Sequence, residues 1–354
     1  MPFRIAIVND LAMAREALRR VVMQIPDTTV AWTANDGAEA LDRARKDRPD
    51  LVLMDLIMPV MDGVDSTRAI MREAPCPIVV VTATVEGNAS RVYEAIGAGA
   101  LDAVDTPRLG SSGAQGDRAL VAKVAAVRRM RDEERSPRPA SATGAGSPHG
   151  TKDAAAAHPG SGPCPVVAVG ASTGGPQALA TLLRSLPSPA AFGVVIVQHM
   201  DAAFLAGLAQ WLGAQTGRDV RLARRGDRPH AGAVLIAGEP MQLVMTSDGT
   251  LDYVEGDPNL IHRPSVDVFF QSLAHVRCSP GAAVLLTGMG QDGAAGMLGL
   301  RQLGWRTFAQ DEATSVVWGM PGSASKLGAA ERVLPMQEIG RAVAEAIAAK
   351  GGHR

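Results

Sequence analysis

The sequence is poor in aromatic residues, cysteine and net charge, and each shortage argues against a class of protein. Phe, Trp and Tyr make up 3% of the 354 residues, which argues against base-stacking platforms for single-stranded nucleic acid. Lys and Arg number 35 against 36 Asp and Glu, a net charge of −1 that excludes a strongly basic nucleic-acid binder. The cysteines Cys76, Cys164 and Cys278 lie too far apart to predict a disulfide framework or a metal site.

Long apolar runs are also missing. No run approaches the roughly 18 residues of a membrane span, and the start of the chain, Met1-Pro-Phe-Arg-Ile, lacks the apolar core of a signal peptide. We therefore expect a cytoplasmic protein without a membrane span. Apolar residues still reach 46% in short runs, enough for a sizeable core, and 354 residues suggest two domains.

One segment separates the two expected domains. Residues 129–165 are rich in Pro, Gly, Ser, Ala and charge and hold almost no large apolar side chain. Such a stretch buries too little surface to offset the entropy of ordering it, so it is predicted to be a flexible linker. An ordered loop draped over one domain is the alternative, although loops of this length are rare in compact domains. The predicted domains are then residues 1–128 and 166–350.

Both predicted domains alternate short apolar runs with helical patterns. The runs in the first domain are Phe3–Val8, Val30–Ala34, Leu51–Met54, Ile78–Val81 and Leu101–Val104. The runs in the second are Val166–Val169, Val194–Val197, Val234–Ile236, Ala283–Leu286 and Thr307–Ala309. Unbroken apolar strands are typical of parallel sheets with helices on both faces. The sequence therefore predicts the α/β class, as two doubly wound parallel-sheet domains with their sites at the carboxyl ends of the strands.

Acidic residues follow two strands of the first domain. Asp10 comes after the first strand and Asp55 after the third, while Thr82 ends the fourth. Strand ends of a parallel sheet are neighbours, so two carboxylates and a hydroxyl are expected to converge. Paired carboxylates are hard oxygen ligands and predict a Mg²⁺ site. The alternative is that each Asp only caps the helix after it.

The segment DLVLMDLIMPVMDG, with VTA at 81–83, resembles a response-regulator receiver domain over residues 1–128. The resemblance implies a flavodoxin-like fold in which Asp55 accepts a phosphoryl group from a histidine kinase. It also implies Mg²⁺ bound by Asp10, Asp55 and the backbone carbonyl of Ile57. Thr82 would then bond a phosphoryl oxygen and act as the switch residue.

Three positions depart from the usual receiver pattern. Asn9 stands where the first acid of a pair is usual, Ala103 replaces the switch aromatic, and Thr106 replaces a lysine. A counter-charge to the phosphoryl group is missing, and Arg108 is a candidate to supply it. The way in which phosphorylation is relayed is therefore not given by the resemblance.

A nucleophile pattern opens the second domain. The turn Gly170-Ala171-Ser172-Thr173-Gly174-Gly175-Pro176 follows a predicted strand, and its Gly170–Gly174 spacing fits G-x-S-x-G. A glycine-rich phosphate cradle is the competing interpretation, but the turn lacks both the G-x-G-x-x-G order and the P-loop lysine. A serine here would project above the sheet beside backbone N–H groups. The turn therefore favours nucleophilic catalysis by Ser172.

A base and an orienting acid also lie at strand ends. His199 directly follows the strand run that ends at Val197-Gln198, whereas His230, His262 and His275 lack that placement. An imidazole with a pKa of about 6.5 can take a serine proton. Asp292 follows another buried strand, in a glycine-rich loop. It is expected to orient His199, and it is also placed to cap the helix that begins near Ala294.

Five separated segments resemble the CheB chemotaxis methylesterase family over roughly 166–345. They are GASTGG, VQHM, HRPSVDVFFQSLA, LLTGMGQDGAAGM and QDEATSVVWGMP. The resemblance implies a Rossmann-like domain in which Ser172 is the nucleophile, His199 the general base and Asp292 its orienting acid. Met289 and Thr173 would supply the oxyanion donors. The receiver segments NDGAEAL and VDTPRLG further resemble the Wsp-type, surface-sensing branch.

The family implies a phosphorylation-regulated protein-glutamate methylesterase that releases methanol from chemoreceptors, with protein-glutamine glutaminase activity besides. It implies that the unphosphorylated receiver covers the active-site face. Its partners would be a methyl-accepting chemoreceptor and a histidine kinase, with no nucleic acid. A non-catalytic receiver protein that drains kinase phosphate is the main alternative. A nucleotide-dependent oxidoreductase and a DNA-binding regulator are disfavoured, the first by the missing glycine fingerprint and the second by the near-zero net charge.

Overall fold

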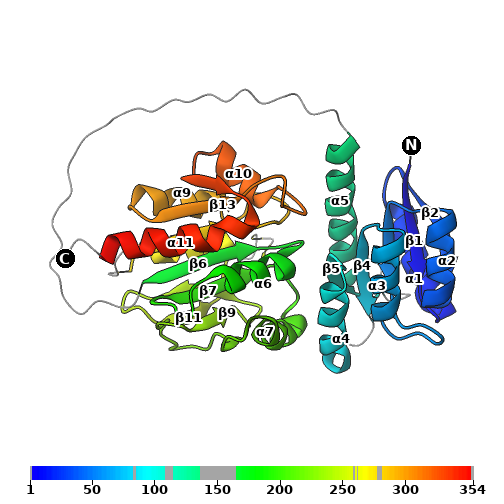
Figure 1. Ribbon diagram of the computed structural model, residues 1–354, viewed down its shortest axis with the longest axis horizontal. Helices are drawn as coiled ribbons and strands as arrows, with labels where there is room; N and C mark the ends of the chain where they lie inside the picture. The colour runs from blue at the N-terminus through cyan, green and yellow to red at the C-terminus, as the bar shows by residue number, and fades with distance from the viewer. Residues whose placement is uncertain are drawn as a thin grey trace.

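The computed structural model describes residues 2–82, 85–107, 115–135, 165–257, 260, 262–276 and 281–351. Figure 1 shows two α/β units side by side, each built on a central parallel sheet. The smaller unit holds the N-terminus. Within the described ranges, no helix combines the length and the apolar character needed to cross a bilayer.

The N-terminal unit has a five-stranded sheet of order β2-β1-β3-β4-β5, all parallel. Its elements are β1 (Phe3–Val8), α1 (Ala12–Gln24), β2 (Thr28–Ala34), α2 (Gly37–Lys46), β3 (Leu51–Met54), α3 (Gly63–Glu73), β4 (Ile78–Thr82), α4 (Val85–Gly97), β5 (Asp102–Asp105) and α5 (Gln115–Arg135). Helices α1 and α5 pack on one face, and α2, α3 and α4 on the other. The predicted flavodoxin-like order is confirmed.

Helix α5 runs further than the sequence predicted. It ends at Arg135, so residues 129–135 are helical rather than the start of the linker. The segment RMRDEER consists mainly of strong helix formers, and its charge alone does not break a helix. The rest of the predicted linker, residues 136–164, lies outside the described ranges.

The C-terminal unit has a seven-stranded parallel sheet of order β14-β13-β12-β6-β7-β9-β8. Its elements are β6 (Val166–Ala171), α6 (Gly175–Ser185), β7 (Gly193–Gln198), α7 (Ala202–Thr216), β8 (Val220–Leu222), β9 (Val234–Ile236), β10 (Gln242–Met245), β11 (Leu251–Val254), α8 (Val266–Leu273), β12 (Ala282–Leu285), α9 (Ala294–Gln302), β13 (Arg306–Gln310), α10 (Met320–Lys326), β14 (Arg332–Leu334) and α11 (Met336–Gly351). The strand order reverses between β6 and β12. Open sheets of this kind bind ligands at such a switch point.

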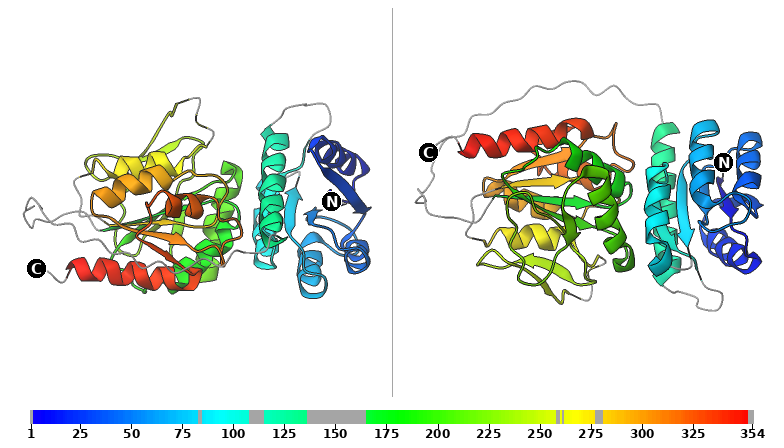
Figure 2. Two further views of the ribbon diagram at one scale, coloured as in Figure 1. Left: turned by 90° about the horizontal axis from the view of Figure 1, so that it is seen from above. Right: turned by 60° about the horizontal axis from the view of Figure 1, so that its bottom comes forward.

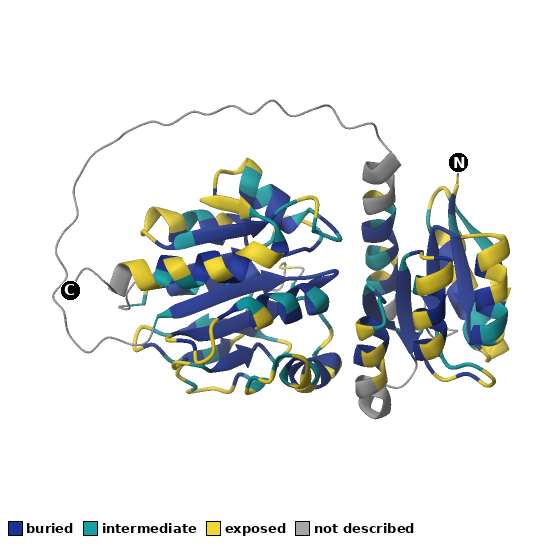
Figure 3. Ribbon diagram, in the orientation of Figure 1, coloured by how far each residue is buried: buried dark blue, intermediate teal, exposed yellow. Residues whose placement is uncertain are grey.

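Two layers cover this sheet. Helices α6, α7 and α11 pack on one face, and α8, α9 and α10 pack on the other. Strands β10 and β11 form an antiparallel pair outside the main sheet. Figure 3 shows the central strands buried throughout. The sequence did not predict the edge strands β8 and β14, because both are only partly buried and show no unbroken apolar run.

Helix α4 of the N-terminal unit packs against α7 of the C-terminal unit, as the views in Figure 2 show. Tyr93 on α4 is fully buried, and its Oη donates to the Phe204 carbonyl of α7 at 2.8 Å. The same Oη lies 3.0 Å from the Met200 sulfur. On the C-terminal side, Gln177 Nε2 in the first turn of α6 donates to the Ile96 carbonyl.

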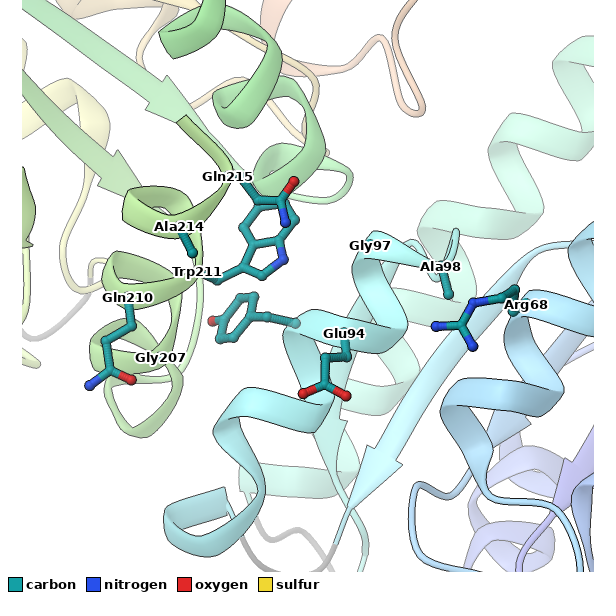
Figure 4. A pocket seen from close by; sticks show the side chains of 10 residues that line it. Arg68, Glu94, Gly97, Ala98, Gly207, Gln210, Trp211, Ala214 and Gln215 are labelled. Carbon is teal, nitrogen blue, oxygen red and sulfur yellow. The ribbon is translucent and has the colours of Figure 1, made fainter. Parts of the chain in front are cut away.

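A cleft of about 540 Å³ opens beside this contact, between α4 and α7 (Figure 4). Tyr93 and Trp211, whose ring centroids are 5.8 Å apart, lie at its wall. None of the three predicted catalytic residues lines it.

The Tyr93 hydroxyl is expected to stabilise the docked arrangement by about 1 kcal/mol, the net value of a buried hydrogen bond. In the full chain, Tyr93→Phe should therefore raise the hydrogen–deuterium exchange of α4 backbone amides. Tyr253→Phe is the matched control, because Tyr253 Oη bonds Ala223 and Gly238 inside the C-terminal unit. Unchanged exchange in α4 of Tyr93→Phe would contradict the role given to this hydroxyl.

Candidate active site

Ser172 lies in the turn between β6 and α6, at the carboxyl edge of the sheet. Gly174 takes a φ of 77°, a left-handed conformation that glycine adopts without strain, and α6 begins at the next residue. Ser172 is 8% exposed. The predicted strand–turn–helix setting of this serine is therefore present.

Neighbouring segments hold the Ser172 turn in place. The Ser172 backbone N–H donates to the Thr287 carbonyl at 3.0 Å, and the fully buried Gln198 Nε2 donates to the Ser172 carbonyl at 2.9 Å. A Cβ at Gly288 would lie 2.7 Å from the Ser172 Cβ. Position 288 must therefore be glycine for the loop after β12 to approach the serine so closely.

His199 and Asp292 are brought together across the sheet edge. His199 follows β7, the strand that pairs with β6, and its backbone N–H donates to the Ala171 carbonyl at 2.9 Å. Its Nε2 lies 2.8 Å from Asp292 Oδ2. The two side chains are only 8% and 10% exposed. The expected acid–imidazole pair is thus formed, from residues 93 positions apart.

The Asp292 carboxylate is held by the N-terminus of α8. It accepts hydrogen bonds from Ser265 Oγ at 2.7 Å and from the backbone N–H groups of Val266 (2.7 Å) and Asp267 (2.9 Å). The expectation that Asp292 caps the helix near Ala294 was wrong, because the N-cap of α9 is Gly293. Burial by itself would raise the pKa of Asp292, but its bonds to His199, Asp267 and Ser265 outweigh that and hold the pKa well below the usual range.

Ser172 Oγ makes no hydrogen bond to His199 within the described part of the chain, and His199 Nδ1 is buried there without a partner. Because Nε2 faces a carboxylate, the tautomer assigned from this bond carries its proton on Nε2. Nδ1 then keeps a free lone pair. Bonds of this kind often close only when substrate binds.

Two backbone N–H groups beside Ser172 are free for an oxyanion. Neither Thr173 N–H nor Met289 N–H donates to any other residue that the structure describes. The Thr173 carbonyl accepts from Thr287 Oγ1 at 2.9 Å, which fixes the peptide next to the serine. Thr173 is buried and Met289 is half-buried. Backbone donors without partners suit a charge that develops during a reaction.

Three residues of the site were missed from the sequence. Gln198 supports the serine turn, Ser265 holds Asp292, and His262 stacks on His199 with ring centroids 4.0 Å apart and planes 8° from parallel. Ser265, before an apolar run, carries the signal of a helix N-cap and was open to prediction. Gln198 and His262 carry no such local signal.

In the receiver unit, Asp55 makes a side-chain bond that the sequence did not predict. Asn9 Nδ2 donates to Asp55 Oδ2 at 2.8 Å, so the residue in place of an acid bonds the predicted phosphoacceptor directly. Asp10 is exposed nearby. Burial, with a smaller contribution from the Asp10 charge, raises the pKa of Asp55 to about 6. Hydrogen bonds from the Leu56 and Ile57 N–H groups act in the opposite direction but do not cancel this rise.

The switch region is only partly described. Thr82 is buried, and its carbonyl accepts from the Thr106 N–H at 3.0 Å. Thr106 Oγ1 is buried with no partner among the described residues. A hydroxyl is neutral, so Thr106 does not supply the positive charge of the usual lysine. Ala103 is buried in β5. Arg108 lies outside the described ranges.

The half-buried His262 gives a pH dependence with a definite sign. Burial and the neighbouring His199 lower its pKa from 6.5 to about 4, so the unfolded chain binds more protons between these values. Stability should therefore fall as pH drops from 6.5 towards 4. Urea unfolding at pH 7 and pH 5 should show a smaller loss for His262→Phe than for wild type. The exposed His230→Gln should behave as wild type, and an equal loss in His262→Phe would refute the assignment.

Comparison with known proteins gives the family. The CheB methylesterase family matches residues 167–343, and the response regulator receiver domain matches residues 5–108. The "protein-glutamate methylesterase/protein-glutamine glutaminase" proteins of Burkholderia lata and Pseudomonas fluorescens are 50% and 46% identical, each over 95% of this chain and over 96% and 97% of their own.

A solved structure agrees for the C-terminal unit. The crystal structure of the Thermotoga maritima CheB methylesterase catalytic domain is 33% identical, with a TM-score of 0.50, and covers 52% of this chain and 99% of its own. With the strand order and the residues gathered at the switch point, these matches show that the chain belongs to the CheB methylesterase family and carries a response regulator receiver domain at its N-terminal side.

Proposed function

We propose that this protein is a serine esterase that hydrolyses glutamate γ-methyl esters on methyl-accepting chemoreceptors and releases methanol. It also deamidates receptor glutamines, which are hydrolysed through the same acyl chemistry with ammonia as the leaving group. The names of its relatives in Burkholderia and Pseudomonas support both activities.

The observation that carries the proposal is the His199–Asp292 pair beside the Ser172 turn. A buried carboxylate fixes one nitrogen of the imidazole and leaves the other nitrogen unpartnered. Two backbone donors are free at the same place. Such a set is recognised by the roles of its members, whatever their order in the chain.

In the first step, His199 Nδ1 takes the Ser172 hydroxyl proton while Oγ bonds to the ester carbonyl carbon. The carbonyl oxygen becomes an oxyanion, which the N–H groups of Thr173 and Met289 stabilise, each by about 3 kcal/mol. The C–OCH₃ bond then breaks, and methoxide leaves as methanol with the proton from His199. An acyl-enzyme on Ser172 remains.

In the second step, water attacks the acyl carbon and gives a proton to His199. The bond to Ser172 Oγ breaks, Oγ takes the proton back, and the glutamate carboxylate is freed. Asp292 stays ionised throughout, because its four hydrogen bonds favour the charged form. It thereby stabilises the imidazolium formed in each step.

Ser172→Ala should abolish methanol release from methylated receptor in membranes, because no other group forms the acyl bond. A loss of at least 10⁴-fold is expected. Ser185→Ala, a change at the far end of α6, is the matched control and should keep full turnover. Retained turnover in Ser172→Ala would refute the nucleophile.

The receiver unit supplies regulation, with Asp55 accepting a phosphoryl group from a histidine kinase. The Asp10 and Asp55 carboxylates and the Ile57 carbonyl are hard oxygen donors that suit Mg²⁺, and the raised pKa of Asp55 reflects a pocket in which a cation would favour the charged form. When bound, Mg²⁺ would offset negative charge on the phosphoryl oxygens. Thr82 is the proposed switch residue.

Helix α4 links the receiver to both catalytic segments. Tyr93 contacts Met200, the residue after His199, and the Ile96 carbonyl bonds Gln177 in the helix that follows Ser172. We infer that unphosphorylated receiver restrains this edge of the catalytic unit and that phosphorylation of Asp55 favours an arrangement with α4 displaced. Phosphorylation can shift only states that it stabilises unequally.

A small-molecule phosphodonor should therefore raise the rate of methanol release, and Asp55→Ala should abolish the increase while leaving basal turnover. Asp42→Ala, which removes an exposed acid of the same unit, serves as control and should still respond. Equal stimulation of the Asp55→Ala protein would show that the phosphodonor acts elsewhere.

The alternative of a non-catalytic phosphate drain is not favoured, because it gives no role to the His199–Asp292 pair or to the free N–H donors. The partners of the proposed activity are a methyl-accepting chemoreceptor and a histidine kinase, and its location is the cytoplasm. Membership of the Wsp-type branch stays a prediction.

A further inference from the structure

His262 covers one face of the catalytic imidazole. Its ring stacks on that of His199, with the two centroids 4.0 Å apart and an angle of 8° between the ring planes. The mechanism above gives His262 no chemical step. Its position against the reacting base nevertheless calls for a function.

The backbone that carries His262 is clamped by one side chain. Gln242 of β10 is fully buried, and its Nε2 donates to the His262 carbonyl at 2.9 Å. The Oε1 of the same amide accepts from the Ser265 N–H at 2.7 Å. Both ends of the segment 262–265 are therefore fixed to the hairpin, so the His262 ring is not on a loosely held loop.

Ser265 of this segment and the next residue, Val266, also hold Asp292, through Ser265 Oγ and the Val266 N–H. The acid and the stacking ring therefore belong to one rigid support. Asp292 restrains His199 through a single nitrogen, and a single hydrogen bond leaves the ring free to tilt about that contact. A flat neighbour at van der Waals distance opposes the tilt.

Charge at this position agrees with a stacking role. The charged or titratable groups that act on His262 are His199, Asp292 and Lys123 of α5. Burial and His199 lower its pKa to about 4, so the ring is neutral at physiological pH. A neutral aromatic face tolerates the imidazolium that forms on His199, whereas a second cation would repel it.

We propose that His262 is a positioning residue for the proposed esterase reaction: its stacked ring fixes the plane of the His199 imidazole and so the direction of the unpartnered Nδ1. This inference rests on the proposed function for its kinetic test. It requires a flat ring at position 262 and no proton transfer by that ring.

The test compares His262→Phe, which keeps a flat ring, with His262→Leu, which keeps apolar bulk without a plane. The full chain is assayed for methanol release from a peptide with a glutamate γ-methyl ester. His262→Phe should retain kcat within about threefold, and His262→Leu should lose about tenfold or more in kcat with KM unchanged, because small misplacements of a base are costly. Equal activity of both variants and wild type, or equal loss in both, would overturn the proposal.

A second measurement separates this inference from the proposed function. In a Ser172→Ala background, the NMR shift of the His199 Cε1 proton reports the ring stacked on it without any turnover. His262→Leu should move this resonance strongly downfield, and His262→Phe should keep it upfield. If no protein releases methanol but these shifts occur, the proposed reaction fails and the stacking role stands. If the resonance does not respond to His262→Leu, the stacking role fails.

Discussion

The capture of the Asp292 carboxylate at the N-terminus of α8 is the interaction on which the catalytic unit depends. A buried carboxylate is costly unless its oxygens are bonded, and here Ser265, Val266, Asp267 and His199 satisfy them. The helix N-terminus adds a favourable dipole. Because the acid stays charged, the imidazole beside it is held in one tautomer. The Asp292 carboxylate thereby connects three segments: the loop after β12, the start of α8 and the end of β7.

Sheet topology explains why these groups meet. Strands β6, β7 and β12 are neighbours, and the residues after their carboxyl ends form the site at the place where the strand order reverses. Glycine at position 288 lets the β12 loop approach Ser172 closely. A doubly wound sheet thus supplies rigid positions, and short loops supply the reacting groups.

The two units are joined at α4 and α7, where buried apolar side chains surround the Tyr93 hydroxyl. The Tyr93 hydroxyl bonds the first turn of α7 and contacts Met200, the residue after His199. Gln177, in the helix that follows Ser172, donates to the Ile96 carbonyl of α4. A displacement of α4 would therefore change contacts next to both His199 and Ser172.

The sequence by itself determined the two parallel sheets, since unbroken apolar runs such as Val194–Val197 can only be buried on both faces. It also placed Ser172, His199 and Asp292 at strand ends. Local patterns did not reveal the edge strands β8 and β14, the extension of α5 to Arg135, or the hydrogen bonds of Asp292 to the start of α8. Only the tertiary structure assigned roles to His262 and Gln198. Stacking and long-range hydrogen bonds depend on which segments the fold brings together, and the hydrophobic periodicity of the sequence does not determine those contacts.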